Sequence, residues 1–388
     1  MIKSKFSNNT LTILLHGKLD SSNANEMQEA ILKEIQKHPQ GEILIDARNL
    51  TYLSSAGLRV FLSLGKFYKV QEIINLSPEI YEIFDSTGFN RIFKTRKVLG
   101  KVRIDGMQEL GHGVSGSVYR LSDDEIIKVY FEHWDLDRVE KERDIAQQSF
   151  VNGVDTAISY DIVEVGNRYG VVYEMIKADT LENVLLGLQN DEEKLKKIAR
   201  EYALFVKKQN NVEITGAFAD MKARCIEDVK KADFLPEDIR SLLLKEMEHI
   251  PEKRSFVHGD CHPGNVMYKE GEFFLIDMED ASFGHSAFDI GRIYFLMKIL
   301  PDITREVGPK KLPDCVWDTF VRTYYDTDQE DELASYQKIL GIFGMIRDVA
   351  KANMGPEKIK IQEKIVSYLV QYLRDNLQAG SLNCMAYT

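Results

Sequence analysis

Several polar side chains that could accept a proton or bind a metal lie between residues 258 and 277. The segment begins His-Gly-Asp-Cys-His-Pro-Gly-Asn and ends with a short apolar strand closed by Asp277. Phosphoryl transfer from a metal-bound nucleotide needs a carboxylate beside the attacking hydroxyl, and oxygen ligands that hold Mg²⁺ against the phosphates. Asp260 is therefore the predicted proton acceptor, and Asn265 and Asp277 are the predicted Mg²⁺ ligands. The step from Asp260 to Asn265 equals that of a kinase catalytic loop.

A nucleotide also needs a cradle, and a glycine-rich turn lies far upstream. Gly111, Gly113, Gly116 and Val118 form the pattern G-x-G-x-x-G-x-V between two predicted strands. Because these glycines carry no side chain, backbone amides can approach the phosphates. The turn alone is a weak signal, and it gains weight from the lysine that follows it and from the loop at 258–265.

That lysine, Lys128, occupies the apolar strand 126–130. A buried cation there can contact the α and β phosphates and pair with a carboxylate on the next helix. The pattern predicts that helix at 136–150. Glu142 is the predicted partner of Lys128, and Glu140 is the second choice.

A further buried strand, 171–176, is expected to end at the hinge between two lobes. The backbone of Glu174 and Ile176 would there hydrogen-bond the adenine ring of ATP. GTP stays open as an alternative nucleotide.

Residues 104–388 resemble the aminoglycoside phosphotransferase and choline kinase-like branch of the kinase superfamily. The signature His-Gly-Asp-x-His-Pro-x-Asn is matched at 258–265, and Ile-Asp-Met-Glu-Asp-Ala at 276–281 resembles the Ile-Asp-Trp-Glu-Asp-Ala of that branch. The resemblance implies an α+β bilobal protein kinase-like domain, with an N-lobe at about 104–176 and a C-lobe at about 177–388.

The same resemblance implies a role for each matched residue, with Asp260 as catalytic base, Asn265 and Asp277 as Mg²⁺ ligands and Lys128 as the phosphate-binding lysine. His258 and Asp289 would support the catalytic loop, and neither His258 nor His262 is expected to bind a metal. Met278 replaces the usual Trp, and Ala178 replaces a frequent Gly. Neither position is among the residues implied to bind phosphate or metal, so these differences affect the expected substrate class more than the expected activity.

Only eleven residues, 278–288, separate Asp277 from Asp289. Protein kinases place a long activation segment after the metal-binding aspartate, and that segment is the platform for a peptide substrate. The short segment favours a small-molecule hydroxyl acceptor, such as an aminoglycoside, an amino alcohol or a sugar. Its site would be built by C-terminal helices, for instance 193–210 and 235–249.

The first hundred residues alternate strand and helix patterns, which predicts a separate α/β domain at 1–97. Its expected elements are strand 10–19, helix 23–38, strand 42–46, helix 56–68, strand 72–76, helix 80–87 and strand 92–94. A short basic linker, 98–103, joins this domain to the next.

The segment Leu-Ser-Ser-Ala-Gly-Leu-Arg at 53–59 resembles the STAS domain of anti-sigma factor antagonists, and the resemblance covers nearly all of 1–97. It implies a partner of the anti-sigma factor type and a phosphorylated serine at the position of Ser55. The usual aspartate before that serine is Ser54 here. Ser55 is also the expected N-cap of the next helix, and a helix N-terminus equally stabilises a phosphate. Capping alone and a phosphoswitch both stay open.

Two alternatives to a small-molecule phosphotransferase remain. One is a serine kinase that acts on Ser55 or on a partner's STAS domain in sigma-factor partner switching. The other is a non-enzymatic, ATP-sensing anti-sigma factor antagonist. The intact set of Lys128, Asp260, Asn265 and Asp277 argues against the second, because a scaffold has no chemical need for all four.

The chain carries 50 Lys and Arg against 61 Asp and Glu, a net charge of −11. Residues 1–100 hold 13 basic and 10 acidic side chains, so the acidic excess belongs to the later part. An acidic surface repels nucleic acid, which is therefore not an expected partner.

No apolar run is long enough to span a membrane. The four cysteines form no paired motif, so we expect reduced thiols and a cytoplasmic protein; they are Cys225, Cys261, Cys315 and Cys384.

Overall fold

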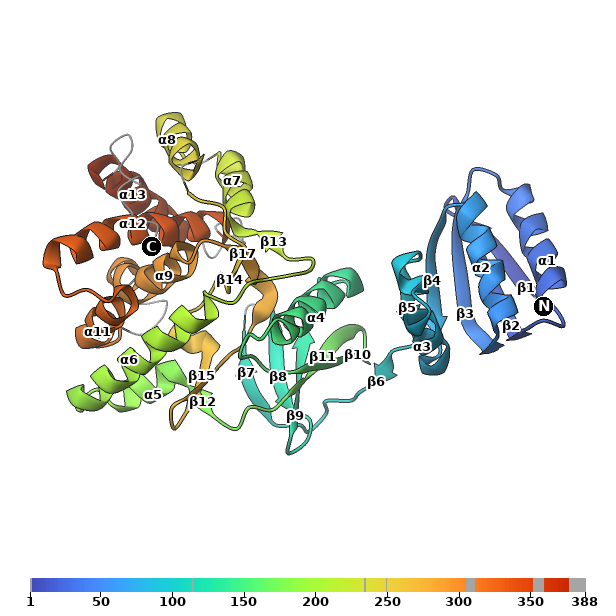
Figure 1. The fold of residues 1–388 in the computed structure, drawn as a ribbon, viewed down its shortest axis with the longest axis horizontal. Helices are drawn as coiled ribbons and strands as arrows, with labels where there is room; N and C mark the ends of the chain where they lie inside the picture. Colours follow the sequence, from blue (N-terminus) through green and yellow to red (C-terminus); the bar gives the residue numbers. More distant parts are fainter. Residues whose placement is uncertain are drawn as a thin grey trace. The chain divides into compact units, whose positions relative to one another are not determined.

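The computed structural model describes residues 2–376, apart from 114, 234, 249, 305–310 and 352–358 (Figure 1). Contacts within the chain divide it into two units, Met1–Arg103 and Ile104–Thr388. Cys384 and the end of the predicted helix 235–249 lie outside the described residues. No described helix combines the length and the apolar composition that crossing a membrane requires.

The first unit is a five-stranded sheet in the order β1-β2-β3-β4-β5, with three helices. β1 runs antiparallel to β2, and the other neighbouring strands are parallel. The strands are β1 (Ile2–Ser7), β2 (Thr10–Leu19), β3 (Glu42–Leu53), β4 (Val70–Leu76) and β5 (Thr95–Lys97), and the helices are α1 (Ala24–Lys37), α2 (Ser55–Phe67) and α3 (Pro78–Ser86).

Hydrophobic periodicity explains how these elements share one core. Leu11, Ile13 and Leu15 of β2 are buried and alternate with partly exposed residues, as a period of two places them on one face. Ile31 and Ile35 of α1 are buried four residues apart, on one face of the helix. All five side chains belong to the same buried cluster. The first unit is thus the predicted α/β domain.

The start of α2 corrects one prediction. Its N-cap is Ser54, whose hydroxyl accepts a hydrogen bond from the Gly57 N–H at 3.4 Å. Ser55, the predicted cap, is the first helical residue and is exposed. The extended backbone that an N-cap requires is found at Ser54, which has φ −100° and ψ 175°.

The last strand of this unit begins later than predicted. The chain makes a 3-10 turn at Phe89–Arg91 and buries Phe93, so β5 begins at Thr95 instead of Ile92. Of the apolar pair at 92–93, only Phe93 is buried in the core, whereas Ile92 is exposed, and the strand itself is polar. β1 was not expected, because its sequence is polar and only its pairing with β2 defines it.

The second unit begins with an antiparallel sheet in the order β10-β11-β9-β8-β7 and one helix, α4. Ile127 and Val129 of β9 are completely buried, on the face opposite to Lys128. Asp135 caps α4 by accepting from the Arg138 N–H at 2.9 Å. The elements are β7 (Glu109–His112), β8 (Gly116–Arg120), β9 (Glu125–Tyr130), α4 (Leu136–Val151), β10 (Ser159–Val165) and β11 (Arg168–Glu174).

The remainder of this unit is helical, with two three-stranded sheets, β12-β15-β16 and β13-β17-β14. The strands are β12 (Asp179–Thr180), β13 (Ala219–Asp220), β14 (Ser255–Val257), β15 (Val266–Lys269), β16 (Glu272–Leu275) and β17 (Ser282–Gly284). The helices are α5 (Leu181–Gly187), α6 (Glu192–Gln209), α7 (Met221–Lys231), α8 (Glu237–Glu248), α9 (Ala287–Tyr294), the π-helical turn η4 (Phe295–Ile299), α10 (Leu300–Thr304), α11 (Asp314–Tyr325), α12 (Glu330–Lys351) and α13 (Ile359–Asn376). The unit is α+β, as predicted.

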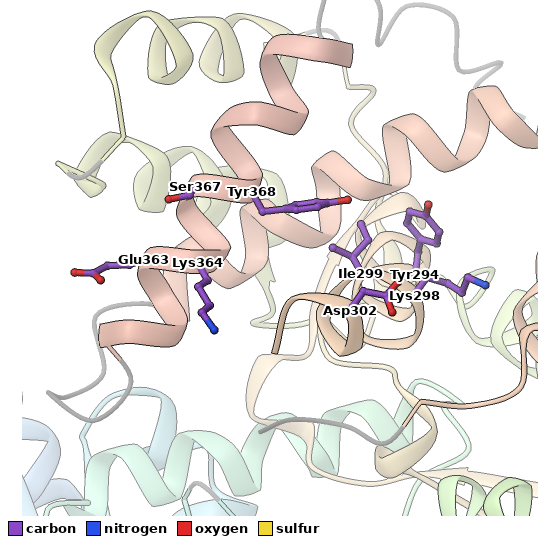
Figure 2. Close-up of a pocket in the computed structure, with 8 residues that line it drawn as sticks. All are labelled: Tyr294, Lys298, Ile299, Asp302, Glu363, Lys364, Ser367 and Tyr368. Carbon is purple, nitrogen blue, oxygen red and sulfur yellow. The ribbon is translucent and has the colours of Figure 1, made fainter. Parts of the chain in front are cut away.

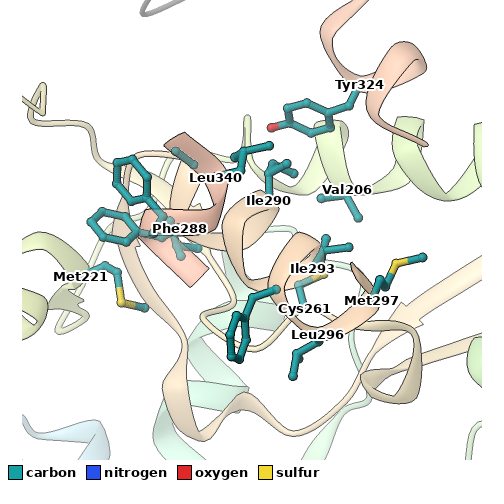
Figure 3. Packing of buried hydrophobic residues seen from close by; sticks show 14 of the residues in the cluster. Val206, Met221, Cys261, Phe288, Ile290, Ile293, Leu296, Met297, Tyr324 and Leu340 are labelled. Carbon is teal, nitrogen blue, oxygen red and sulfur yellow. The ribbon is translucent and has the colours of Figure 1, made fainter. Parts of the chain in front are cut away.

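Helix α9 is held at the centre of this unit. Side chains from several other helices surround it, as Figure 3 shows for Val206 of α6, Met221 of α7 and Leu340 of α12. Its closest neighbour is α12, because two glycines face each other at their crossing: a Cβ on Gly344 would lie 2.3 Å from the Gly291 carbonyl oxygen. This crossing holds α9 tightly against α12.

Candidate active site

A cavity of about 580 Å³ in the second unit collects the predicted nucleotide and metal residues. Its walls come from the antiparallel sheet, α4, the 174–180 segment and the 264–278 region. All ten residues predicted to bind nucleotide or metal line it: Gly111, Gly113, Gly116, Val118, Lys128, Glu142, Glu174, Ile176, Asn265 and Asp277. Glu140, the second choice for the partner of Lys128, does not line it.

The glycines of the turn serve two different purposes. A Cβ on Gly116 would lie 2.1 Å from the Val129 carbonyl oxygen, so the close approach of β8 to β9 requires glycine there. A Cβ on Gly111 would meet nothing within 4 Å, and one on Gly113 would meet only the Gly116 oxygen at 3.7 Å. Packing does not require glycine at these two positions. Their lack of side chains instead leaves the cavity wall open to a ligand.

Lys128 of β9 contacts both α4 and the residue Asp277. Its Nζ donates to Glu142 Oε1 at 2.7 Å and to Asp277 Oδ1 at 2.9 Å. Burial acts to lower the pKa of Lys128, but the charges of Glu142 and Asp277 outweigh burial and raise it. Burial likewise raises the pKa of Glu142, and Lys128 opposes that shift. Lys128 is therefore a permanent cation at the wall of the cavity.

Glu174 and Ile176 lie where the chain leaves the sheet. The Glu174 carboxylate accepts from the Ile158 N–H at 3.3 Å, which fixes its side chain next to the residue that precedes β10. The Ile176 carbonyl accepts from the Ala178 N–H at 2.9 Å. None of the hydrogen bonds between described backbone groups uses the Ile176 N–H.

Asp260 is held by an arginine that the sequence interpretation missed. Arg292 Nε donates to Asp260 Oδ1 at 2.7 Å, and the arginine is only 6% exposed. Asn265 Nδ2 donates to the Asp260 carbonyl at 3.0 Å, which ties the two ends of the loop together. The position of Arg292 three residues after Asp289 was the available signal, since residues so spaced lie on one face of a helix.

Asp289 supports the same loop from α9. It is fully buried and accepts from the N–H groups of His258 and Gly259 at 2.9 and 2.7 Å, and from Asn210 Nδ2 at 2.8 Å. Burial raises the pKa of Asp289, and these donors oppose the shift. Asp289 thus fixes the backbone that carries Asp260.

His258 links the loop to the strand that ends at Asp277. Its Nε2 lies 3.0 Å from the Ile276 carbonyl, and its Nδ1 lies 3.3 Å from the Asp260 N–H. These contacts assign the neutral tautomer with the proton on Nε2, which donates to the carbonyl while Nδ1 accepts. Both ring nitrogens are engaged within the protein.

The donor set at the metal position fits a hard divalent cation. The amide nitrogen of Asn265 is used by its bond to Asp260, so its oxygen is the atom left to ligate. Asp277 Oδ1 contacts Lys128, and the carboxylate is 42% exposed toward solvent. Carboxylate and amide oxygens are the ligands that Mg²⁺ uses in nucleotide sites, together with phosphates and water.

Two further arginines hold the segment after Asp277, and no motif predicted either contact. Arg138 Nη2 donates to Glu279 Oε1 at 2.7 Å. Arg224 Nη2 donates to Asp280 Oδ1 at 2.8 Å. Asp280 is thereby tied to α7.

Comparison with known proteins identifies both parts of the chain. The model of the phosphotransferase enzyme family matches residues 106–308, and that of the STAS domain matches residues 1–102. A putative anti-sigma factor antagonist, BtrV of Bordetella bronchiseptica, is 31% identical over 87 residues, which are 21% of this chain and 74% of the relative. Methylthioribose kinase of Bacillus velezensis is 32% identical over 109 residues, 27% of this chain.

This chain spans only about a quarter, 26%, of the length of that methylthioribose kinase. Among solved structures, the ternary complex of APH(2″)-IIa with streptomycin and ATP has a TM-score of 0.47 at 16% identity, and the match covers 79% of this chain and 99% of that one. The chain belongs to the phosphotransferase enzyme family and carries a STAS domain at its N-terminus.

Proposed function

We propose that this protein transfers the γ-phosphate of ATP, with Mg²⁺, to a hydroxyl group of a small molecule. The observation that supports this most is the gathering of all ten predicted nucleotide and metal residues on one cavity. Lys128 would contact the phosphates, Asn265 and Asp277 would hold Mg²⁺, and Ile176 would bind adenine. When bound, Mg²⁺ would neutralise charge on the phosphates.

Asp260 would accept the proton of the acceptor hydroxyl. Arg292 donates to the Asp260 carboxylate and so fixes its orientation. Asp289 and His258 keep the loop backbone rigid, which limits loss of alignment between the attacking and leaving groups. The protein would contribute position and electrostatics, as phosphoryl transfer requires.

The segment after Asp277 favours a small acceptor over a peptide. Met278–Asp280 forms a 3-10 turn, and β17 then pairs with both β13 and β14 before α9 begins at Ala287. Within 278–288, all residues except 281, 285 and 286 thus belong to a helix or a strand. A peptide platform of the protein-kinase type would have no residues from which to form.

A second cavity, of about 830 Å³, is the proposed acceptor site (Figure 2). It opens between the η4–α10 region and α13, and Tyr368 extends from α13 toward the opposite wall. Two phenol rings, two amines and two carboxylates line it, which suits a hydroxyl compound that also carries charged groups; they belong to Tyr294, Lys298, Asp302, Glu363, Lys364 and Tyr368. Tyr294 in its wall and Arg292 both belong to α9.

The STAS domain is proposed to bind a protein partner of the anti-sigma factor type. Ser55 is exposed in the first turn of α2, so a kinase could reach it. This observation keeps a second candidate function, in which the acceptor is Ser55 itself or a partner's STAS domain. The two candidates differ in where the phosphate goes.

One labelling experiment separates them. The full chain is incubated with γ-labelled Mg·ATP alone, and then with a panel of aminoglycosides, amino alcohols, methylthioribose and other sugars, and label is followed by mass spectrometry. We expect label on one class of small hydroxyl compound and none on Ser55. Asp260→Asn is the inactive control, and Ser55→Ala is the matched control that should behave as the parent. Stoichiometric labelling of Ser55 that both variants abolish would overturn the proposal.

A further inference from the structure

The four residues from Asp277 to Asp280 are anchored by cations from three different elements. Asp277 contacts Lys128 of β9 at 2.9 Å, and Glu279 contacts Arg138 of α4 at 2.7 Å. Asp280 contacts Arg224 of α7 at 2.8 Å. The first two cations belong to the antiparallel sheet β10-β11-β9-β8-β7 and to α4, at the start of the second unit. The third belongs to the helical remainder of that unit. This short segment therefore joins the two parts across the cavity.

The Arg138 side chain is held in place before it reaches Glu279. Its guanidinium carbon lies 3.4 Å from the centroid of the Trp134 ring, and Trp134 is only 4% exposed. Trp134 packs on Tyr130 at 4.9 Å, and the Tyr130 ring lies 5.2 Å from Lys128 Nζ. A guanidinium stacked on a fixed aromatic ring loses little further freedom on pairing. The contact therefore differs from an ordinary surface ion pair.

Asp277 needs such support because its backbone is strained. It has φ 64° and ψ 71°, in the left-handed region that residues with a Cβ rarely adopt. A strained residue persists only where the surrounding structure holds both of its flanks. Before Asp277, Ile276 is held by Asn265 and His258. After Asp277, the ion pairs of Glu279 and Asp280 with arginines hold the chain in place.

We propose that Arg138 and Glu279 are positioning residues for the metal ligand Asp277. Their ion pair fixes the first turn of α4 to the segment that carries Asp277. Because Glu142 lies one turn further along α4, the same contact also keeps Glu142 within reach of Lys128 and Asp277. The inference rests on the proposed function, since it assigns how that site is assembled.

The expected strength of the Arg138–Glu279 ion pair follows from the solvent exposure of its two side chains. The side chains of Arg138 and Glu279 are 48% and 37% exposed, so water and salt screen their attraction. A pair of this kind with a stacked arginine corresponds to roughly a 3- to 10-fold change in an equilibrium constant. Loss of the pair should therefore weaken Mg²⁺ binding with nucleotide by about that factor.

The test is a double-mutant cycle with Arg138→Gln, Glu279→Gln and the double variant of the full chain. The readout is the Mg²⁺ concentration that gives half of the ATP-dependent rise in melting temperature, which needs no acceptor. We expect each single variant to raise this concentration by roughly 3- to 10-fold, and the double variant to add little more, because either change already removes the pair. Lys141→Gln, an exposed position on the same helix, should behave as the parent.

Three outcomes would overturn the inference: additive effects of the two changes, no effect of either, or a far larger effect of Glu279→Gln than of Arg138→Gln. The last outcome would make Glu279 a metal ligand. Arg138→Lys keeps the charge without the planar stacking, and should fall between parent and Arg138→Gln; its melting temperature without ligand checks that folding is intact. A parent that does not bind Mg·ATP at all would instead refute the proposed function.

Discussion

Arg292 and Asp260 form a buried ion pair, with Nε donating to Oδ1 at 2.7 Å across 32 residues of sequence. The arginine is carried by α9, whose position is set by its glycine crossing with α12. The orientation of the proposed catalytic base therefore depends on helix packing outside the loop that contains it.

Arg292→Gln should lower turnover while leaving nucleotide binding nearly intact. The base would keep its chemistry and lose its fixed orientation, and a misplacement on the order of 1 Å can lower a rate by about 10²-fold. The measurement is kcat with the acceptor found by labelling, beside the ATP-dependent rise in melting temperature. Equal kcat in variant and parent would show that Asp260 does not need this partner.

Asp260→Asn and Asp277→Asn should fail in different ways. Removal of a positioned proton acceptor lowers turnover by roughly 10² to 10⁴, so Asp260→Asn should bind Mg·ATP like the parent and turn over slowly. Asp277→Asn should lose Mg²⁺-dependent nucleotide binding as well, because Asp277 is a proposed ligand. Melting temperatures with ATP and EDTA, and with ATP and Mg²⁺, separate the two. Identical profiles for both variants would contradict the assigned roles.

The sequence predicted the parts of the site that lie in contiguous motifs. Asp260 and Asn265 sit in one loop at a fixed spacing, and Lys128 and Glu142 sit in a strand and the helix after it, so local pattern was enough. Arg292 was missed because its partner lies in another element. Its spacing from Asp289 indicates a shared helix face, but that spacing does not say which distant carboxylate the arginine contacts. Adjacent serines gave a similar failure: Ser54 and Ser55 have the same capping chemistry, and only the backbone angles select Ser54.

His285 should make the second unit sensitive to mild acid. Burial, together with the nearby positive charge of Lys253, lowers the pKa of His285 to about 4 from an ordinary value near 6.5. Its Nδ1 accepts from the Ala287 N–H at 3.1 Å, which only the neutral ring can do. The unfolded chain therefore takes up the proton first, and stability present above pH 6.5 is lost as the pH falls toward 4, by up to about 3 kcal/mol.

His285→Asn tests this directly. Asparagine keeps an acceptor for the Ala287 N–H but does not titrate, so the free energy of unfolding should fall less between pH 6.5 and 4 than in the parent. Urea denaturation at several pH values, followed by tryptophan fluorescence, measures the difference. Parallel pH profiles for variant and parent would assign the acid sensitivity to other groups.

Gly344→Ala should destabilise the second unit and disturb the site together. The added Cβ would lie 2.3 Å from the Gly291 carbonyl oxygen and 2.4 Å from Phe295 Cβ, and both neighbours are packed helix atoms that cannot turn away. Overpacking of this kind costs about 1–3 kcal/mol and moves backbone. The displaced element would be α9, so turnover should fall more than nucleotide binding, through Arg292. Gly187→Ala is the matched control, because a Cβ there meets nothing within 4 Å. Denaturant midpoints and kcat of the two variants decide the matter: a Gly344→Ala protein as stable and active as Gly187→Ala would mean that α9 and α12 do not cross as closely as described.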